Sequence, residues 1–100
     1  MQNDLSKNNT ELLSLVGRNA LYLSYGTPKG EFLSAYRAAI ITEARYKEGE
    51  SADIVQCKLC VLNPAGVFFT YWLDFDDSNE PKSGTYRFPY NETPLFHTAH

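Results

Sequence analysis

Two cysteines and two histidines have the spacing of metal or redox sites. Cys57-Lys58-Leu59-Cys60 is a C-x₂-C motif, and His97 and His100 could complete a set of four zinc ligands. The residues around the motif alternate between apolar and polar, which predicts a strand. Residues three apart on a strand point to opposite faces, so the two sulfur atoms would diverge. We therefore predict that Cys57 is a core residue, and that the chain has no metal site and needs no cofactor.

An acidic segment resembles a calcium-binding loop in its spacing only. Counted from Asp74, the sixth position is Asn79 instead of Gly, and the twelfth is Thr85 instead of Glu. A solvated loop explains this composition better, and such a loop presents negative charge to a basic partner. The predicted partner-binding residues are Asp74, Asp76, Asp77 and Glu80.

The sequence offers little for catalysis. No G-x-S-x-G motif occurs, and both histidines stand in the last four residues. A nucleophile paired with an ordered histidine base is therefore not expected. We predict that the protein is not an enzyme.

Two features suit an anionic ligand. The turn Gly26-Thr27-Pro28-Lys29-Gly30 could direct successive backbone N–H groups toward one point, although a plain connection between strands is the alternative. Alternation predicts that Arg37 and Arg87 point outward, where they could bind phosphate in a bidentate manner or be ordinary surface arginines.

Aromatic residues are unusually abundant, at 14% of the chain. One face of a small sheet cannot bury them all, so some should lie at a rim and either stack on a base or contact another protein. With the turn and the two arginines, they give a predicted ligand-binding set of Tyr25, Thr27, Lys29, Arg37, Tyr71, Trp72, Tyr86 and Arg87.

These residues are positioned by one predicted domain, residues 10–90, between a flexible N-terminus (1–9) and a C-terminal tail (91–100). Thr10 can cap a short helix that Gly17 ends. Period-two patterns then predict five strands, at residues 20–25, 36–46, 54–62, 67–73 and 85–90.

The expected fold is mainly β, with one short N-terminal helix. The strands would form either a small five-stranded antiparallel sheet or a partly open, SH3-like barrel. The strand at 67–73 is apolar on both faces, and at a sheet edge it would favour self-pairing and a homo-oligomer.

Composition narrows the class of partner and the location. The net charge is −3 and the cations are scattered, which argues against non-specific nucleic-acid binding. No run of 18 apolar residues and no signal-peptide pattern occurs. We therefore expect a cytoplasmic protein with reduced cysteines and no membrane partner.

Four segments carry a resemblance to a known group of proteins. They are LYLSYGTP (21–28), RAAIITE (37–43), CVLNPAGVFF (60–69) and GTYRFP (84–89). Together, over roughly residues 17–90, they resemble a family of small uncharacterised proteins encoded by tailed bacteriophages. The last segment departs from the family pattern, because Tyr86 and Phe88 stand where Trp is typical.

The resemblance implies a role in infection, and three roles are open. The first is a non-enzymatic anti-defence protein that sequesters a small anionic signal such as a nucleotide. The second is an inhibitor that docks on a host defence protein through the acidic loop and the aromatic rim. The third is a structural component of the virion head or tail.

Overall fold

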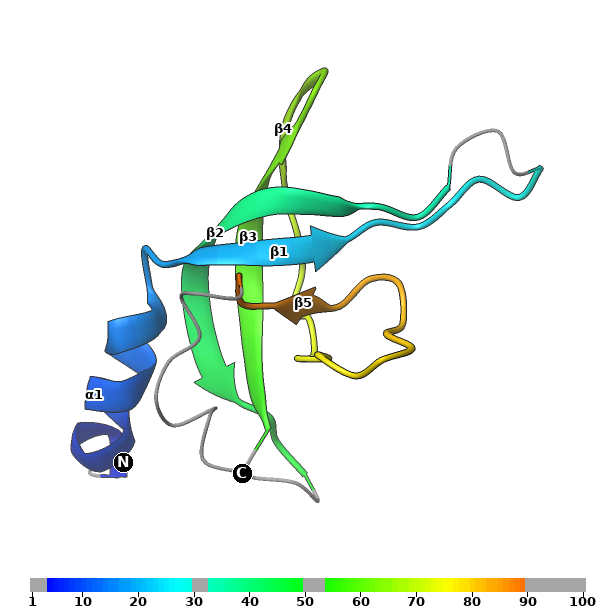
Figure 1. Ribbon diagram of the computed structural model, residues 1–100. Coiled ribbons are helices and arrows are strands. Elements are labelled where there is room, and N and C mark those ends of the chain that lie inside the picture. The colour runs from blue at the N-terminus through cyan, green and yellow to red at the C-terminus, as the bar shows by residue number, and fades with distance from the viewer. Residues whose placement is uncertain (1–3, 30–32, 50–53, 90–100) are drawn as a thin grey trace.

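One antiparallel sheet of five strands organises the chain (Figure 1). The computed structural model describes residues 4–29, 33–49 and 54–89. The elements are the helix α1 (Asp4–Leu15) and the strands β1 (Asn19–Leu23), β2 (Tyr36–Tyr46), β3 (Val55–Asn63), β4 (Gly66–Phe69) and β5 (Tyr86–Arg87). The strand order is β4-β3-β2-β1-β5, so β4 and β5 are the outer strands. The predicted mainly-β fold with a short helix is confirmed.

The elements differ from the predicted ones mainly at their ends. β2 spans Tyr36–Tyr46, as predicted. The helix begins at Asp4 instead of Thr10, so residues 4–9 are helical where a flexible segment was expected. β4 and β5 are shorter than the strands predicted at 67–73 and 85–90. The predicted tail, with His97 and His100, lies outside the described residues.

Helix α1 ends where the sequence predicts. Gly17 adopts a positive φ of 91°, a conformation that glycine reaches without steric cost, and its N–H donates to the carbonyl of Ile41 at 2.7 Å. Leu15 is fully buried, whereas Val16 is 44% exposed. The helix also contacts β2, because the Tyr46 hydroxyl donates to the carboxylate of Glu11. This bond is the largest cause that raises the pKa of Tyr46 to about 12.

The core lies on the inner face of the curved sheet. Alternate residues of β3 are buried there, as the sequence predicts: Cys57, Leu59 and Val61 are completely covered. Tyr86 and Phe88 close the core from the β5 side, with their rings edge to face at 5.8 Å. Burial of apolar and aromatic surface of this kind is the main stabilising contribution in a domain of this size.

A bulge in β2 changes which of its residues face the core. The register with β3 shifts between Ile41 and Glu43, which leaves Thr42 as an extra residue. Ile41 faces the core before the bulge, and Ala44 and Tyr46 pack against the core after it. The bulge therefore lets an eleven-residue strand bend and keep its apolar side chains inside.

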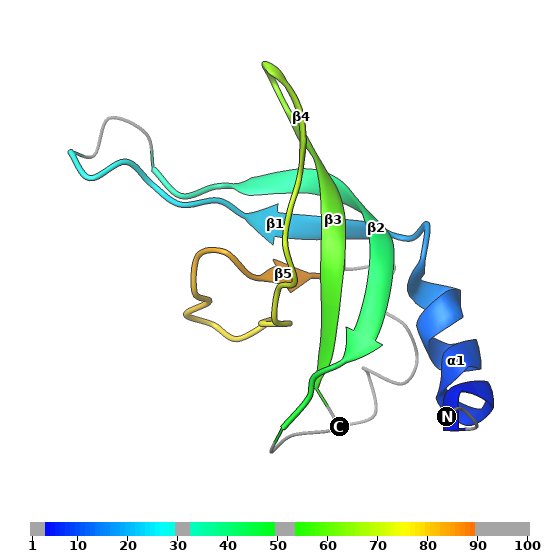
Figure 2. The ribbon, with the colours of Figure 1, turned by 180° about the vertical axis from the view of Figure 1, so that it is seen from behind.

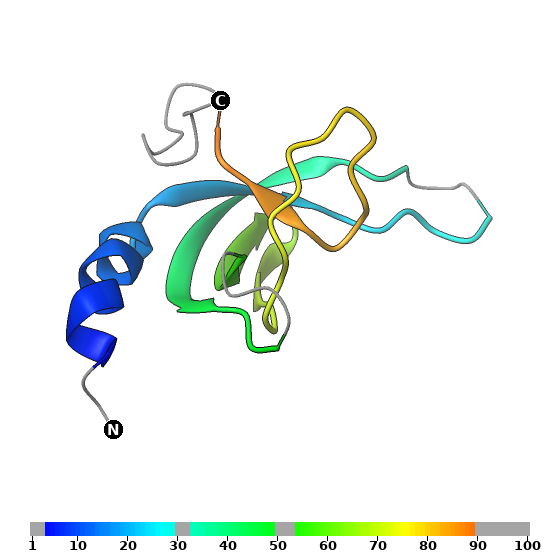
Figure 3. The ribbon, with the colours of Figure 1, turned by 90° about the horizontal axis from the view of Figure 1, so that it is seen from below.

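Residues 73–76 link β3 to β5. Leu73 exchanges two backbone hydrogen bonds with Cys57 of β3, at 3.1 and 2.9 Å. The Tyr86 N–H of β5 donates to the Asp74 carbonyl at 3.1 Å, and the Asp76 N–H donates to the Tyr86 carbonyl at 2.9 Å. Figures 2 and 3 show this arrangement: β1 and β5 run across the direction of β3, and the yellow segment passes in front of β5 when seen from below.

No helix among the described residues is long and apolar enough to cross a membrane.

Candidate functional site

Strand β4 is exposed along its whole length. All four of its residues are exposed, and its sequence, Gly66-Val67-Phe68-Phe69, carries no charge. The turn Asn63–Gly66 joins it to β3, and this hairpin extends beyond the rest of the sheet (Figure 1). Natural edge strands usually carry charges, prolines or covering segments that prevent pairing. β4 has none of these within the described residues.

The outer edge of β4 has backbone groups that point away from β3. Thr70 N–H donates to the Leu59 carbonyl at 2.8 Å, which fixes the alternation of hydrogen-bonded pairs along the hairpin. By this alternation Phe68 turns its N–H and C=O toward β3, while Val67 and Phe69 turn theirs away from the sheet. Those outward groups can accept another strand.

The outer face of the sheet next to β4 is also apolar. Residues that pair directly across strands share a face, and the pairs Leu62–Val67, Cys60–Phe69 and Ile40–Cys60 place these side chains on the face opposite the core. The large members of this group are strongly exposed, and we call them the β4 surface: Ile40 (39%), Leu62 (44%), Val67 (59%) and Phe69 (71%).

A bulge after β4 redirects the next two aromatic side chains. The Leu59 N–H donates to the hydroxyl of Thr70 at 2.9 Å instead of to a carbonyl, and the following pair on β3 is Cys57 with Leu73. One extra residue is therefore inserted opposite β3. Tyr71 is left 78% exposed, and Trp72 lies on the outer face.

Two cations of this chain lie over the ring of Trp72. The Arg45 guanidinium lies 4.2 Å from its ring centroid, and the Lys58 ammonium lies at 5.1 Å. Lys58 also lies 5.7 Å from the Tyr71 ring and 3.8 Å from the Glu43 carboxylate. The sequence predicted Trp72 as a ligand-binding residue, and the structure places its ring in a stack with two cations.

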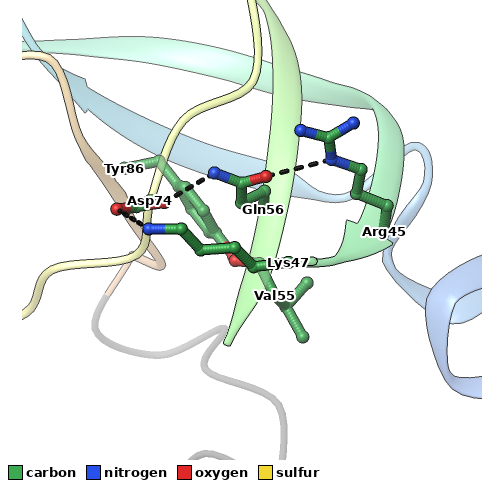
Figure 4. Close-up of polar contacts among 6 residues, drawn as sticks. All are labelled: Arg45, Lys47, Val55, Gln56, Asp74 and Tyr86. Atoms are coloured by element: carbon green, nitrogen blue, oxygen red, sulfur yellow. Dashed lines mark hydrogen bonds and ion pairs between the residues drawn. The ribbon is translucent and has the colours of Figure 1, made fainter. Parts of the chain in front are cut away.

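A polar network fixes the chain after Trp72 onto β3 (Figure 4). Arg45 donates to Gln56 at 3.0 Å, and Gln56 donates to Asp74 at 2.8 Å. Lys47 approaches the other oxygen of Asp74 at 3.1 Å. The Gln56 hydrogen bond, together with Lys47, holds the pKa of Asp74 below its usual value against the partial desolvation of the carboxylate.

The other predicted partner-binding acids divide into one structural and two exposed residues. Asp76 accepts hydrogen bonds from the Ser78 N–H (3.0 Å), the Ser78 hydroxyl (2.6 Å) and the Lys82 N–H (3.0 Å). The bond from the Ser78 hydroxyl is the largest cause that lowers the pKa of Asp76 to about 2. Asp77 and Glu80 are exposed. Asp74 and Asp76 therefore organise the loop, and only Asp77 and Glu80 present free charge.

Tyr86 lies in the core, so its predicted place in a surface ligand site is wrong. It has no exposed surface, and its hydroxyl donates to the Val55 carbonyl at 2.8 Å. Burial raises the pKa of this hydroxyl far above its usual value. Its neighbour Arg87 faces the other way and donates to the Tyr36 hydroxyl at 3.1 Å and to the Asp77 carbonyl at 3.3 Å.

Arg37 does not point outward as predicted. It shares its face of β2 with the buried Ala39 and Ile41, and it pairs directly with Tyr22, which is 8% exposed. The prediction placed Arg37 on the wrong face because the alternation of β2 could be phased from the sequence in either direction.

The remaining predicted ligand residues lie on the connection between β1 and β2. Tyr25 is 68% exposed and its ring lies over Gly84, where a Cβ would approach the Tyr25 hydroxyl to 2.1 Å. Thr27 is half-buried and Lys29 is exposed. Gly30 lies outside the described residues, so the predicted anion-binding turn extends beyond them.

The cysteines occupy the positions that the strand predicts. Cys57 is buried in the core, and burial raises the pKa of its thiol to about 11. Cys60 is half-buried on the opposite face of β3. Within residues 4–29, 33–49 and 54–89, no three His, Cys, Asp or Glu side chains gather as metal ligands.

The predicted ligand-binding residues are thus distributed over separate places, and the β4 surface was not predicted as a unit. The signal that pointed to it was the apolar run from Val67, which has bulky residues on both faces and no room for them in one core. Comparison with known proteins adds no relative, because no family model, curated protein or solved structure matches the chain.

Proposed function

We propose that this protein is a non-enzymatic docking protein that binds a strand of a partner protein along the outer edge of β4. The observation that carries the proposal is the uncharged, fully exposed edge strand, with Val67 and Phe69 presenting both side chains and backbone groups. A partner strand would gain backbone hydrogen bonds from the edge and apolar contact from the β4 surface.

The chemistry of the edge defines the partner segment. It is extended, and it carries apolar side chains at alternate positions that cover Leu62, Val67 and Phe69. Asp77 and Glu80 are exposed on a different part of the molecule, beside β5 at the other end of the strand order. The docking surface that we propose therefore centres on β4 instead of on the acidic loop.

Docking is better supported than stacking of a ligand on the predicted aromatic set. Tyr86 is buried and Trp72 is stacked with Arg45, while Phe69 and Tyr71 are 71% and 78% exposed. Interface cores are enriched in such aromatic side chains. The resemblance to small phage proteins makes a host defence protein the first partner to test.

The test is affinity capture from lysate of infected host cells. Wild-type protein should retain a partner that Val67→Lys and Phe69→Lys each lose, because a buried ammonium group would be left without a counter-charge. Leu33→Lys is the matched control, since Leu33 is 79% exposed on the connection between β1 and β2.

The control variant should capture the same partner as the wild type. Equal capture by all four proteins would contradict docking at β4. Capture that depends on Asp77 and Glu80 instead would place the docking surface at the acidic loop. If the captured partner is a virion protein, the result would favour a structural role in the virion head or tail.

A further inference from the structure

Among the described residues, Arg37 has no counter-charge. Its side chain is half-buried, and its Nε is buried with no hydrogen-bond partner among the described residues. Neither of the ion pairs found in the described part of the chain includes it, since these join Lys47 to Asp74 and Lys58 to Glu43. A guanidinium partly removed from water is unfavourable unless an anion or a set of acceptors compensates it.

The surroundings of Arg37 are aromatic. In the β1–β2 register it lies directly opposite Tyr22, so the two side chains are neighbours on the inner face of the sheet. The ring of Tyr22 meets the ring of Phe68 edge to face at 5.7 Å, and Phe68 is 37% exposed. Three strands, β1, β2 and β4, thus bring one cation and two aromatic rings to one end of the inner face.

The side chain of Tyr22, whose ring meets Phe68, also carries a neutral hydroxyl donor. Burial, and secondly the proximity of Tyr25, raise the pKa of Tyr22 above its usual value. The hydroxyl therefore keeps its proton at neutral pH and can donate a hydrogen bond to an anion.

We propose that Arg37, Tyr22 and Phe68 form a binding site for a phosphate-bearing planar ligand, that is, a nucleotide. The phosphate binds the guanidinium N–H groups of the half-buried Arg37, and its negative charge compensates the cation whose buried Nε has no acceptor among the described residues. The exposed part of Phe68 provides a surface on which a base can stack. This site lies on the face of the sheet opposite the β4 surface, so the two proposals rest on different residues.

Thermal unfolding with defined probes tests the site. Inorganic phosphate, adenosine, and a panel of linear and cyclic nucleotides are added at constant ionic strength. A nucleotide should raise the melting temperature of the wild type in a saturable manner, and adenosine should not, because it lacks the phosphate. Arg37→Met should weaken nucleotide binding by about tenfold to a hundredfold, the effect of losing a charged hydrogen bond.

Arg87→Met is the matched control, since Arg87 is also half-buried but bonds to Tyr36 and to the Asp77 carbonyl. It should keep the nucleotide response. Without ligand, Arg37→Met should keep or raise its melting temperature, because it removes an uncompensated charge.

Three results would overturn the site. These are no saturable shift of the wild type with any nucleotide, an equal shift in Arg37→Met, and a lower melting temperature of the ligand-free Arg37→Met protein. The last result would mark Arg37 as a structural residue. Failure of these tests leaves capture through β4 unaffected.

Discussion

The Tyr86 hydroxyl is a structural group that anchors the last strand to the core. It donates to the Val55 carbonyl inside the protein, while the ring contacts Phe75 and Phe88. Tyr86→Phe leaves that buried carbonyl without this donor, which should lower the free energy of unfolding by about 1–3 kcal/mol. Urea unfolding measures the change, with an unchanged slope against denaturant.

Tyr71→Phe is the control for this residue-scale prediction, because Tyr71 is 78% exposed and its hydroxyl can bond to water. It should change stability by less than about 0.5 kcal/mol. Equal stability of Tyr86→Phe and the wild type would contradict the anchoring role. The sequence does not distinguish these two tyrosines, since the burial of each depends on contacts from strands far away in the chain.

At the scale of elements, Asp74 connects residues 73–76 to β3. Its folded-state pKa is lowered, so the carboxylate contributes stability above the unfolded pKa of about 4, and this is lost as the pH falls through the folded value. The side chain is 43% exposed, so the contribution should stay below about 1 kcal/mol. Asp74→Asn keeps an acceptor for Gln56 but should unfold with a weaker dependence on pH below about pH 4.

Melting temperature measured across this range tests the prediction, with Asp77→Asn as the control. Asp77 is exposed, and its carbonyl, not its carboxylate, accepts from Arg87. The control should therefore follow the wild-type curve. If Asp74→Asn also follows that curve, Asp74 is not the titrating link between the segment and β3.

The elements themselves were predictable where local pattern decides them. β2 and the helix end at Gly17 follow from alternation and from a glycine with positive φ. The end of β4 was not predictable, because the hydroxyl of Thr70 replaces a carbonyl and creates a bulge that only the pairing with β3 reveals. The positions of two predicted ligand residues could not be predicted for the same reason. Strand pairing and bulges decide that Trp72 meets Arg45 and that Arg37 faces inward.

At the scale of the whole molecule, the sheet is one unit that remains open at β4. Residues 73–76 bond to β3 and β5, so the Cys57 and Leu73 amides should exchange with solvent hydrogen only when the whole domain unfolds. Along β4, Thr70 donates inward to Leu59 and the alternation turns Val67 and Phe69 outward. Amide exchange by NMR should therefore be fast at Val67 and Phe69 and slower at Phe68 and Thr70.

Partner binding should remove this difference in exchange rate, because an added strand would accept from the outward N–H groups of Val67 and Phe69. Their exchange should then slow toward that of Phe68, while Leu33, on the distant connection, keeps its rate. Uniformly slow exchange along β4 in the free protein would mean that the edge is already covered, for example by a second copy. An unchanged pattern in the complex would mean that the partner covers side chains without adding a strand.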